Sequence, residues 1–170
     1  MKNIKIVFEQ DPGFVDRCIQ WLTSSDVNHC AVVYDSADWE EPWIAEAAVK
    51  GVRTVPQNNR KWKYIYEVKY DATKDVRAAH QFIGQSYDFA GFFLFGWILL
   101  LWKLLKVKVK HPFRKTKGQF CSEFLGFIIA QELPKEVSDP QWTTPQELVE
   151  ICKKHPERYG DITPTCSSKP

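Results

Sequence analysis

Gly118–Ile129 reads GQFCSEFLGFII and places a cysteine, Cys121, where a basic segment ends and an apolar pattern begins. The glycine interrupts any preceding helix, and the apolar residues after Cys121 recur at the spacing of a buried helix face. Cys121 is therefore predicted to lie near the N-terminus of a helix. Unpaired backbone N–H groups and the helix dipole favour the thiolate over the thiol there, so Cys121 is a candidate nucleophile.

The alternative interpretation of Cys121 is a structural cysteine, because unpaired cysteines are among the most buried residues of proteins. The polar residues on both sides of it favour the catalytic interpretation. Cys18 and Cys152 fall on apolar helix faces and are interpreted as core residues, and Cys30 lies in an apolar strand where packing explains it equally well.

The composition indicates one globular domain, 1–170, because 44% of the 170 residues are hydrophobic and disorder of the whole chain is excluded. The five cysteines are widely spaced with no C-x-x-C pair, which indicates a reducing compartment rather than a disulfide framework. The first residues lack the apolar stretch of a signal peptide. We therefore expect a cytoplasmic protein. The charge pattern of residues 89–118 adds peripheral membrane association as an alternative.

The periodicity of the apolar residues predicts most of the elements. The segment 43–49 fits a strand or a helix by pattern, and its close spacing after the previous strand and the Lys50-Gly51 turn favour a strand. Strands are expected at 4–8, 28–34, 43–49 and 60–70, and helices at 11–25, 73–84 (capped by Thr73), 89–102, from 121 onward, and up to 154. The last helix begins with a capping box, in which Thr144 is the N-cap and Glu147 lies three residues later. This order predicts an α+β fold with an antiparallel sheet packed against helices, followed by a flexible tail, 164–170.

A cysteine nucleophile needs a general base, and His29 is the candidate because it is the one histidine that opens an apolar strand. Glu46 is the candidate for orienting the imidazole, since a carboxylate within an apolar strand is costly unless it is paired. The alternative interpretations are that His29 is a surface or core histidine with no catalytic role and that the Glu46 side chain points to solvent. Tyr87 is a candidate hydroxyl for an oxyanion or substrate, although an aromatic residue at a helix start explains it as well.

Four short motifs follow one another along the chain. They are His29-Cys30-Ala31-Val32-Val33, Glu46-Ala47 with Gly51-Val52, Tyr87-Asp88-Phe89 and Cys121-Ser122-Glu123-Phe124. In this order and spacing, from about Ile4 to Leu148, the chain resembles the circularly permuted papain-like cysteine hydrolases. These form the NlpC-type group that includes the YiiX-like proteins and, further off, relatives of lecithin:retinol acyltransferase. The histidine strand comes before the cysteine helix in this group, as it does here.

The resemblance implies a permuted papain-like fold with a Cys121 nucleophile, a His29 base and a Glu46 orienting residue. It also implies cleavage of an amide or ester through an acyl-enzyme intermediate, on a peptide or an acylated lipid, with no cofactor and no metal. Two features depart from the YiiX-like pattern: the first strand lacks a Gly-Asp opening, and an apolar and then basic segment precedes the cysteine. These departures leave the substrate class open.

The segment 89–118 is predicted to be an insertion made of an apolar helix and a basic loop. Phe89–Trp102 has no charged residue but only 14 residues, and a membrane span needs about 20. Seven of the 23 basic residues of the chain follow it by Gly118, with no acid among them. This composition suits an anionic membrane surface or a partner, and a core helix followed by a solvated loop is the alternative. The predicted surface comprises Phe92, Phe93, Phe95, Trp97, Trp102, Lys103, Lys106, Lys108, Lys110, Arg114, Lys115 and Lys117.

Three other functions compete with this interpretation. A catalytically silent membrane-surface module of the same fold would keep the apolar and basic residues without a working Cys121. Nucleic-acid binding is disfavoured because the aromatic residues form one block instead of alternating with Lys and Arg. A zinc site from Cys152-x-x-His155 lacks a second ligand pair at normal spacing.

Overall fold

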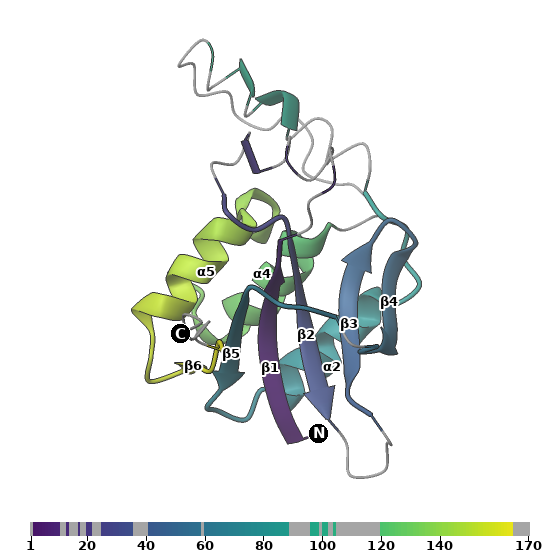
Figure 1. Ribbon diagram of the computed structural model, residues 1–170, viewed down its shortest axis with the longest axis vertical. Coiled ribbons are helices and arrows are strands. Elements are labelled where there is room, and N and C mark those ends of the chain that lie inside the picture. Colours follow the sequence, from purple (N-terminus) through teal and green to yellow (C-terminus); the bar gives the residue numbers. More distant parts are fainter. Residues whose placement is uncertain are drawn as a thin grey trace, which may run out of the picture.

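A computed structural model describes most of the chain (Figure 1). The residues described are 2–10, 13, 17, 20–21, 25–35, 41–58, 60–88, 96–98, 100–101, 104 and 120–164. Most of the predicted helix at 11–25, most of the insertion 89–118 and the tail beyond residue 164 therefore lie outside the described residues, although residues 17, 20 and 21 are helical.

Six strands form a single sheet. They are β1 (Lys2–Glu9), β2 (His29–Asp35), β3 (Trp43–Ala48), β4 (Gly51–Pro56), β5 (Tyr64–Val68) and β6 (Tyr159–Asp161). Their order is β4-β3-β2-β1-β5-β6, and each neighbouring pair is antiparallel. The prediction of an α+β fold with an antiparallel sheet is confirmed.

The helices pack on one face of this sheet, which we call the helix face. They are α2 (Thr73–Ala79), α4 (Cys121–Glu132) and α5 (Pro145–Lys154), with short 3-10 helices η1 (His80–Phe82) and η2 (Pro140–Trp142). Figure 1 shows α2 and α4 behind the strands and α5 beside them. Strand residues such as Ile6, Phe8 and Val32 form one buried cluster with helix residues such as Phe124 and Leu148. Burial of this apolar surface is the main force that holds the helices to the sheet.

The opposite face of the sheet, which we call the far face, has a smaller apolar cluster. Because side chains alternate along a strand, Val7, Ala31, Val33 and Ile44 point away from the helices. All four are buried, and Trp62 packs against them. Both faces of β1–β3 are therefore covered.

The chain between β4 and β5, of which residues 57–58 and 60–63 are described, crosses three intervening strands and is called the crossover segment (Figure 1). The backbone N–H of Gln57 donates to the carbonyl of Pro42 (3.0 Å), and that of Lys63 donates to the carbonyl of Phe8 in β1 (2.7 Å). The predicted strand at 60–70 is therefore wrong at both ends, since β5 covers only Tyr64–Val68. The alternation of aromatic and polar residues extends beyond β5 in the sequence. Residues 60–63, at the start of the predicted strand, belong to the crossover segment instead.

One of the two predicted helix N-caps is confirmed and the other is wrong. In α5 the Thr144 Oγ1 accepts from the Glu147 N–H (3.2 Å) and Glu147 Oε2 accepts from the Thr144 N–H (2.7 Å), so the predicted capping box is confirmed. The predicted cap of the 73–84 helix is wrong, because Ala72 is the N-cap of α2 and provides no side-chain bond. Its chain continues into η1 and turns at Gly84, where φ is +87°.

Candidate active site

Cys121 is the first residue of α4, and its side chain is directed toward β2. The apolar residues of the helix, including Phe124, Leu125 and Ile128, are buried against the sheet and fix the position of its first turn. The Cys121 Sγ lies 3.9 Å from the carbonyl oxygen of Asn28. The backbone N–H and the thiol of Cys30 also hydrogen-bond with it. Cys121 is 8% exposed, so the sulfur lies at the margin of the core.

His29 is the first residue of β2 and contacts both of the other predicted site residues. Its Nε2 lies 2.9 Å from Oε2 of Glu46, and its side chain is 17% exposed. An ionised carboxylate only accepts hydrogen bonds, so Nε2 carries the proton of this contact. The ring also has hydrogen-bonding and charge interactions with Cys121, for which Nδ1 is the nitrogen left. The imidazole therefore connects the far face of the sheet with the start of α4.

Glu46 lies on the far face in β3 and is fully buried. Its Oε1 accepts from Nε (3.0 Å) and Nη2 (2.7 Å) of Arg53, which is its register partner in β4. Its Oε2 accepts from His29 and from Nη1 of Arg60 (2.6 Å) in the crossover segment. A carboxylate has about four lone-pair sites, so these four N–H groups saturate it. The interpretation of Glu46 as a solvent-facing side chain is wrong.

The environment of Glu46 keeps it ionised. Burial alone would raise its pKa, but the hydrogen bonds from His29, Arg60 and Arg53 outweigh burial and hold the pKa well below the usual range of a glutamate. Because the carboxylate is charged over the whole physiological range, it provides a permanent counter-ion for the imidazole.

His29 and Cys121 shift each other's protonation in the directions that form an ion pair. Burial would lower the pKa of His29, but its hydrogen bonds with Cys121 and Glu46 raise it above the ordinary value. Hydrogen bonds from Cys30 lower the pKa of Cys121; burial opposes them, and the contact with His29 lowers it further. The net result is a Cys121 pKa well below the ordinary value. This arrangement favours a thiolate beside an imidazolium.

The other two buried cysteines of the described residues behave in the opposite way. Burial raises the pKa of Cys152 on α5 far above the ordinary value, and burial together with the neighbouring Cys121 raises that of Cys30. The prediction that Cys152 is a core residue is confirmed by its full burial in α5. Cys30 is a core residue as well, and it is also a hydrogen-bond donor to the Cys121 sulfur.

The structure thus brings Cys121, His29 and Glu46 together from three elements. Sequence reasoning missed Arg53 and Arg60. The contact of Arg53 could have been predicted from the sequence, because a two-residue turn at Val49 and Lys50 pairs Arg53 with Glu46 in the β3–β4 hairpin. The contact of Arg60 could not have been predicted in this way, since Arg60 reaches Glu46 only through the crossover segment.

Other predicted site residues are less informative. Tyr87 is half-buried at an isolated β-bridge, and its contact with an oxyanion stays a prediction. Of the predicted membrane or partner surface only Trp97 is described, and it is helical and 59% exposed. The remaining residues of that surface lie outside the described part. No helix within the described residues has the length and apolar character needed to cross a membrane.

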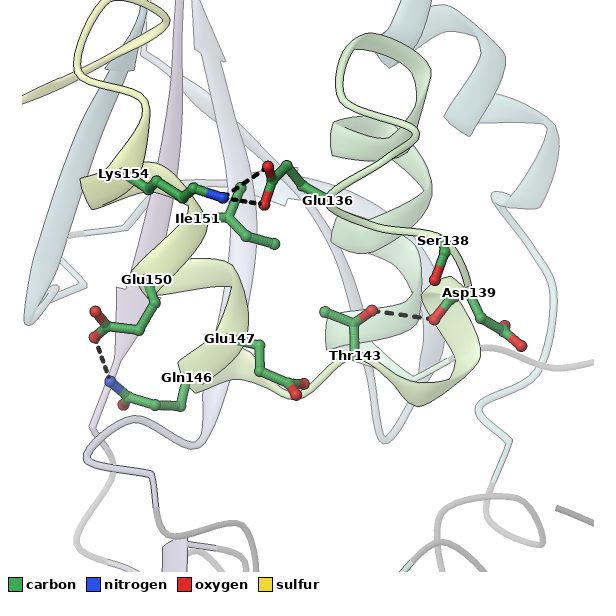
Figure 2. Close-up of a pocket in the computed structure, with 9 residues that line it drawn as sticks. All are labelled: Glu136, Ser138, Asp139, Thr143, Gln146, Glu147, Glu150, Ile151 and Lys154. Atoms are coloured by element: carbon green, nitrogen blue, oxygen red, sulfur yellow. Dashed lines mark hydrogen bonds and ion pairs between the residues drawn. The ribbon is translucent and has the colours of Figure 1, made fainter. Parts of the chain in front are cut away.

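A recess of about 450 Å³ lies apart from the site, between α5 and the loop that follows α4 (Figure 2). It is lined by Glu136, Ser138, Asp139, Thr143, Gln146, Glu147, Glu150, Ile151 and Lys154. Most of its charged groups already have partners: Lys154 Nζ donates to both oxygens of Glu136 (2.8 Å), and Glu147 caps α5. None of the three predicted catalytic residues lines this recess.

Among the described residues, no group of three or more His, Cys, Asp or Glu side chains is arranged to hold a metal ion. Comparison with protein-family models and with curated proteins finds no match for this chain.

Proposed function

We propose that the protein is a thiol hydrolase or acyltransferase that acts on an amide or ester through Cys121. The observation that carries the proposal is the double contact of His29, whose Nε2 lies 2.9 Å from Glu46 while the ring also interacts with Cys121. A nucleophile, a base and a group that orients the base is the arrangement required for covalent acyl transfer. It also supports the permuted papain-like fold, in which the histidine strand precedes the cysteine helix.

The proposed reaction has two halves. The Cys121 thiolate attacks the carbonyl carbon of the substrate, and the imidazolium of His29 gives its proton to the departing amine or alcohol. The acyl group is then held as a thioester. His29, now neutral, takes a proton from water or from an acceptor hydroxyl, whose oxygen attacks the thioester and releases Cys121. In this proposal, backbone N–H groups at the start of α4 stabilise the oxyanion that forms in each half.

The deciding experiment is the pH dependence of Cys121 alkylation by iodoacetamide, followed by peptide mass spectrometry. We expect Cys121 to react well below pH 8.5, the range of an ordinary thiol, while Cys152 in the same protein stays unreactive. His29→Ala should move the Cys121 profile to higher pH and slow the reaction at pH 6 about tenfold or more.

His155→Ala is the matched control for this experiment. His155 also contacts a carboxylate, with Nδ1 3.0 Å from Oε1 of Glu157, but it lies after α5 and has no contact with Cys121. We expect this variant to leave the Cys121 profile unchanged. Equal and slow alkylation of Cys121 and Cys152 at every pH would refute the proposed function.

A membrane-surface module is the second candidate, because two side chains of the insertion 89–118 are exposed. Trp97 is 59% and Leu104 is 65% exposed, next to a segment rich in lysine and arginine. Exposed apolar groups beside basic residues favour binding to anionic lipid. Sedimentation with phosphatidylserine vesicles should show binding that weakens as salt rises and that is unaffected by Cys121→Ser. Absence of binding at low salt would exclude this module.

A further inference from the structure

The crossover segment delivers a second cation to the oxygen that His29 uses. Oε2 of Glu46 accepts from His29 Nε2 at 2.9 Å and from Arg60 Nη1 at 2.6 Å. Because both nitrogens contact the same oxygen, they lie within about 5.5 Å of each other. Arg53 differs from Arg60 in this respect, since both of its N–H groups are directed at Oε1.

The position of Arg60 is determined by contacts on several sides. Its backbone N–H donates to the carbonyl of Gln57, and its guanidinium lies 5.5 Å from the centroid of the Trp62 ring. Its Nη2 is 3.9 Å from Oε2 of Glu9, a β1 residue that pairs with His29 in the sheet. The side chain is 30% exposed, so it forms the solvent boundary of the site. A guanidinium held in this way is part of the site geometry and not a loose surface charge.

Two cations on one carboxylate oxygen compete for it. A guanidinium on Oε2 reduces the negative charge that the imidazolium of His29 experiences, and its own charge repels the imidazolium directly. Arg60 therefore opposes the stabilisation of protonated His29 by Glu46. A base that holds its proton too tightly is a poor proton donor to a leaving group.

We propose that Arg60 is a positioning residue of the site, which shares Oε2 of Glu46 with His29 and so limits how tightly the carboxylate holds the imidazolium proton. The consequence for catalysis rests on the proposed function, in which His29 gives that proton to the leaving group. The sharing itself is a property of the three side chains and can be tested without any substrate.

The test is an NMR titration of the His29 ring in a Cys121→Ser background, which removes the thiolate. Among the described residues, Glu46, Arg60, Arg53 and Glu9 then remain as the charged groups of this network. Adding Arg60→Met should raise the midpoint of the His29 titration by about one pH unit. Adding Glu46→Gln should lower it. The two substitutions should therefore shift the His29 midpoint in opposite directions, because Glu46 stabilises the protonated imidazole and Arg60 destabilises it.

Two further variants separate charge from shape. Arg60→Lys keeps a cation near Oε2 and should leave the midpoint close to that of the background protein. Arg60→Gln removes the charge but retains an N–H donor, so it should raise the midpoint by less than Arg60→Met does. It also serves if the methionine variant fails to fold. The control is Arg77→Met, which removes an exposed arginine of α2 and should leave the His29 midpoint unchanged.

An unchanged midpoint in both Arg60→Met and Arg60→Gln would overturn the inference. A midpoint lowered as in Glu46→Gln would also overturn it, because Arg60 would then only hold Glu46 in place. Failure of the proposed function looks different: the alkylation profile of Cys121 in the otherwise unchanged protein would be ordinary, while Arg60→Met would still raise the His29 midpoint.

Discussion

Glu46 and Glu123 are both buried glutamates, one on the far face of the sheet and one on α4, but their carboxylates differ in hydrogen bonding. Glu46 accepts four N–H groups from three cationic side chains. Glu123 has hydrogen bonds to Gln141 and to the backbone of Phe120, but its Oε2 has no partner in the described part of the chain. Burial alone therefore does not decide the charge of a carboxylate.

The difference appears as opposite pKa shifts. Hydrogen bonds from cations overcome burial and lower the pKa of Glu46, whereas burial raises that of Glu123 to about 7, with support from the nearby Asp88 and Asp139. The two residues therefore have opposite effects on the pH dependence of stability. Glu46 stabilises the fold above about pH 4.5, its ordinary pKa, and loses this effect as the pH falls. Glu123 stabilises the fold most when it is protonated.

Removing the charge of Glu46 should have the largest effect. Glu46→Gln leaves two guanidinium groups and an imidazole around a neutral amide, and loss of one partner from a buried ion network costs about 3 kcal/mol or more. We expect this decrease in the free energy of unfolding at pH 7 by urea denaturation, together with slower alkylation of Cys121 at pH 6. Glu67→Gln is the matched control, because Glu67 is a strand glutamate of β5 outside this network, paired in register with Lys5. A change under 0.5 kcal/mol in Glu46→Gln would show that the network contributes little.

The next effect concerns Glu123 and has the opposite pH sign. A pKa near 7, compared with 4.5 in the unfolded chain, corresponds to about 3 kcal/mol of stability that is present below pH 4.5 and is lost as the pH rises through 7. Glu123→Gln cannot ionise, so it should be more stable than the unsubstituted protein at pH 8 and of similar stability at pH 5. Thermal unfolding at the two pH values measures the difference. An equal effect of the substitution at pH 5 and pH 8 would contradict the raised pKa.

The smallest effect concerns a third glutamate, Glu147, which is exposed. Its Oε2 accepts from the Thr144 N–H at 2.7 Å in the capping box, where water competes for the same groups. Thr144→Ala should lower the free energy of unfolding by about 1 kcal/mol. Thr73→Ala is the comparison, because Thr73 is not the N-cap of α2, and it should cost less than about 0.5 kcal/mol. Equal costs at the two positions would contradict the difference in capping.

Local patterns predicted the parts of the molecule that depend on nearby residues. The capping box of α5 could be predicted because its two partners lie three residues apart. The start of α4 at Cys121 agrees with its apolar periodicity, and β3 agrees with the strand predicted there from its spacing and the turn that follows. The end of the predicted 60–70 strand and the cap of α2 could not be predicted, because tertiary contacts overrode a locally favourable pattern.

The sequence alone determined the chemical types in the candidate site: a cysteine at a helix start, a histidine at a strand start and an acid within an apolar strand. Local periodicity and the cost of an unpaired buried charge are sufficient for that. Only the tertiary structure decided that the three groups meet, that Arg53 and Arg60 saturate Glu46, and that Glu123 lacks a partner at Oε2 among the described residues. The physical reason is that strand order brings distant residues together. The connection from β4 to β5 carries Arg60 across three strands to the oxygen used by His29, and no local pattern encodes that crossing.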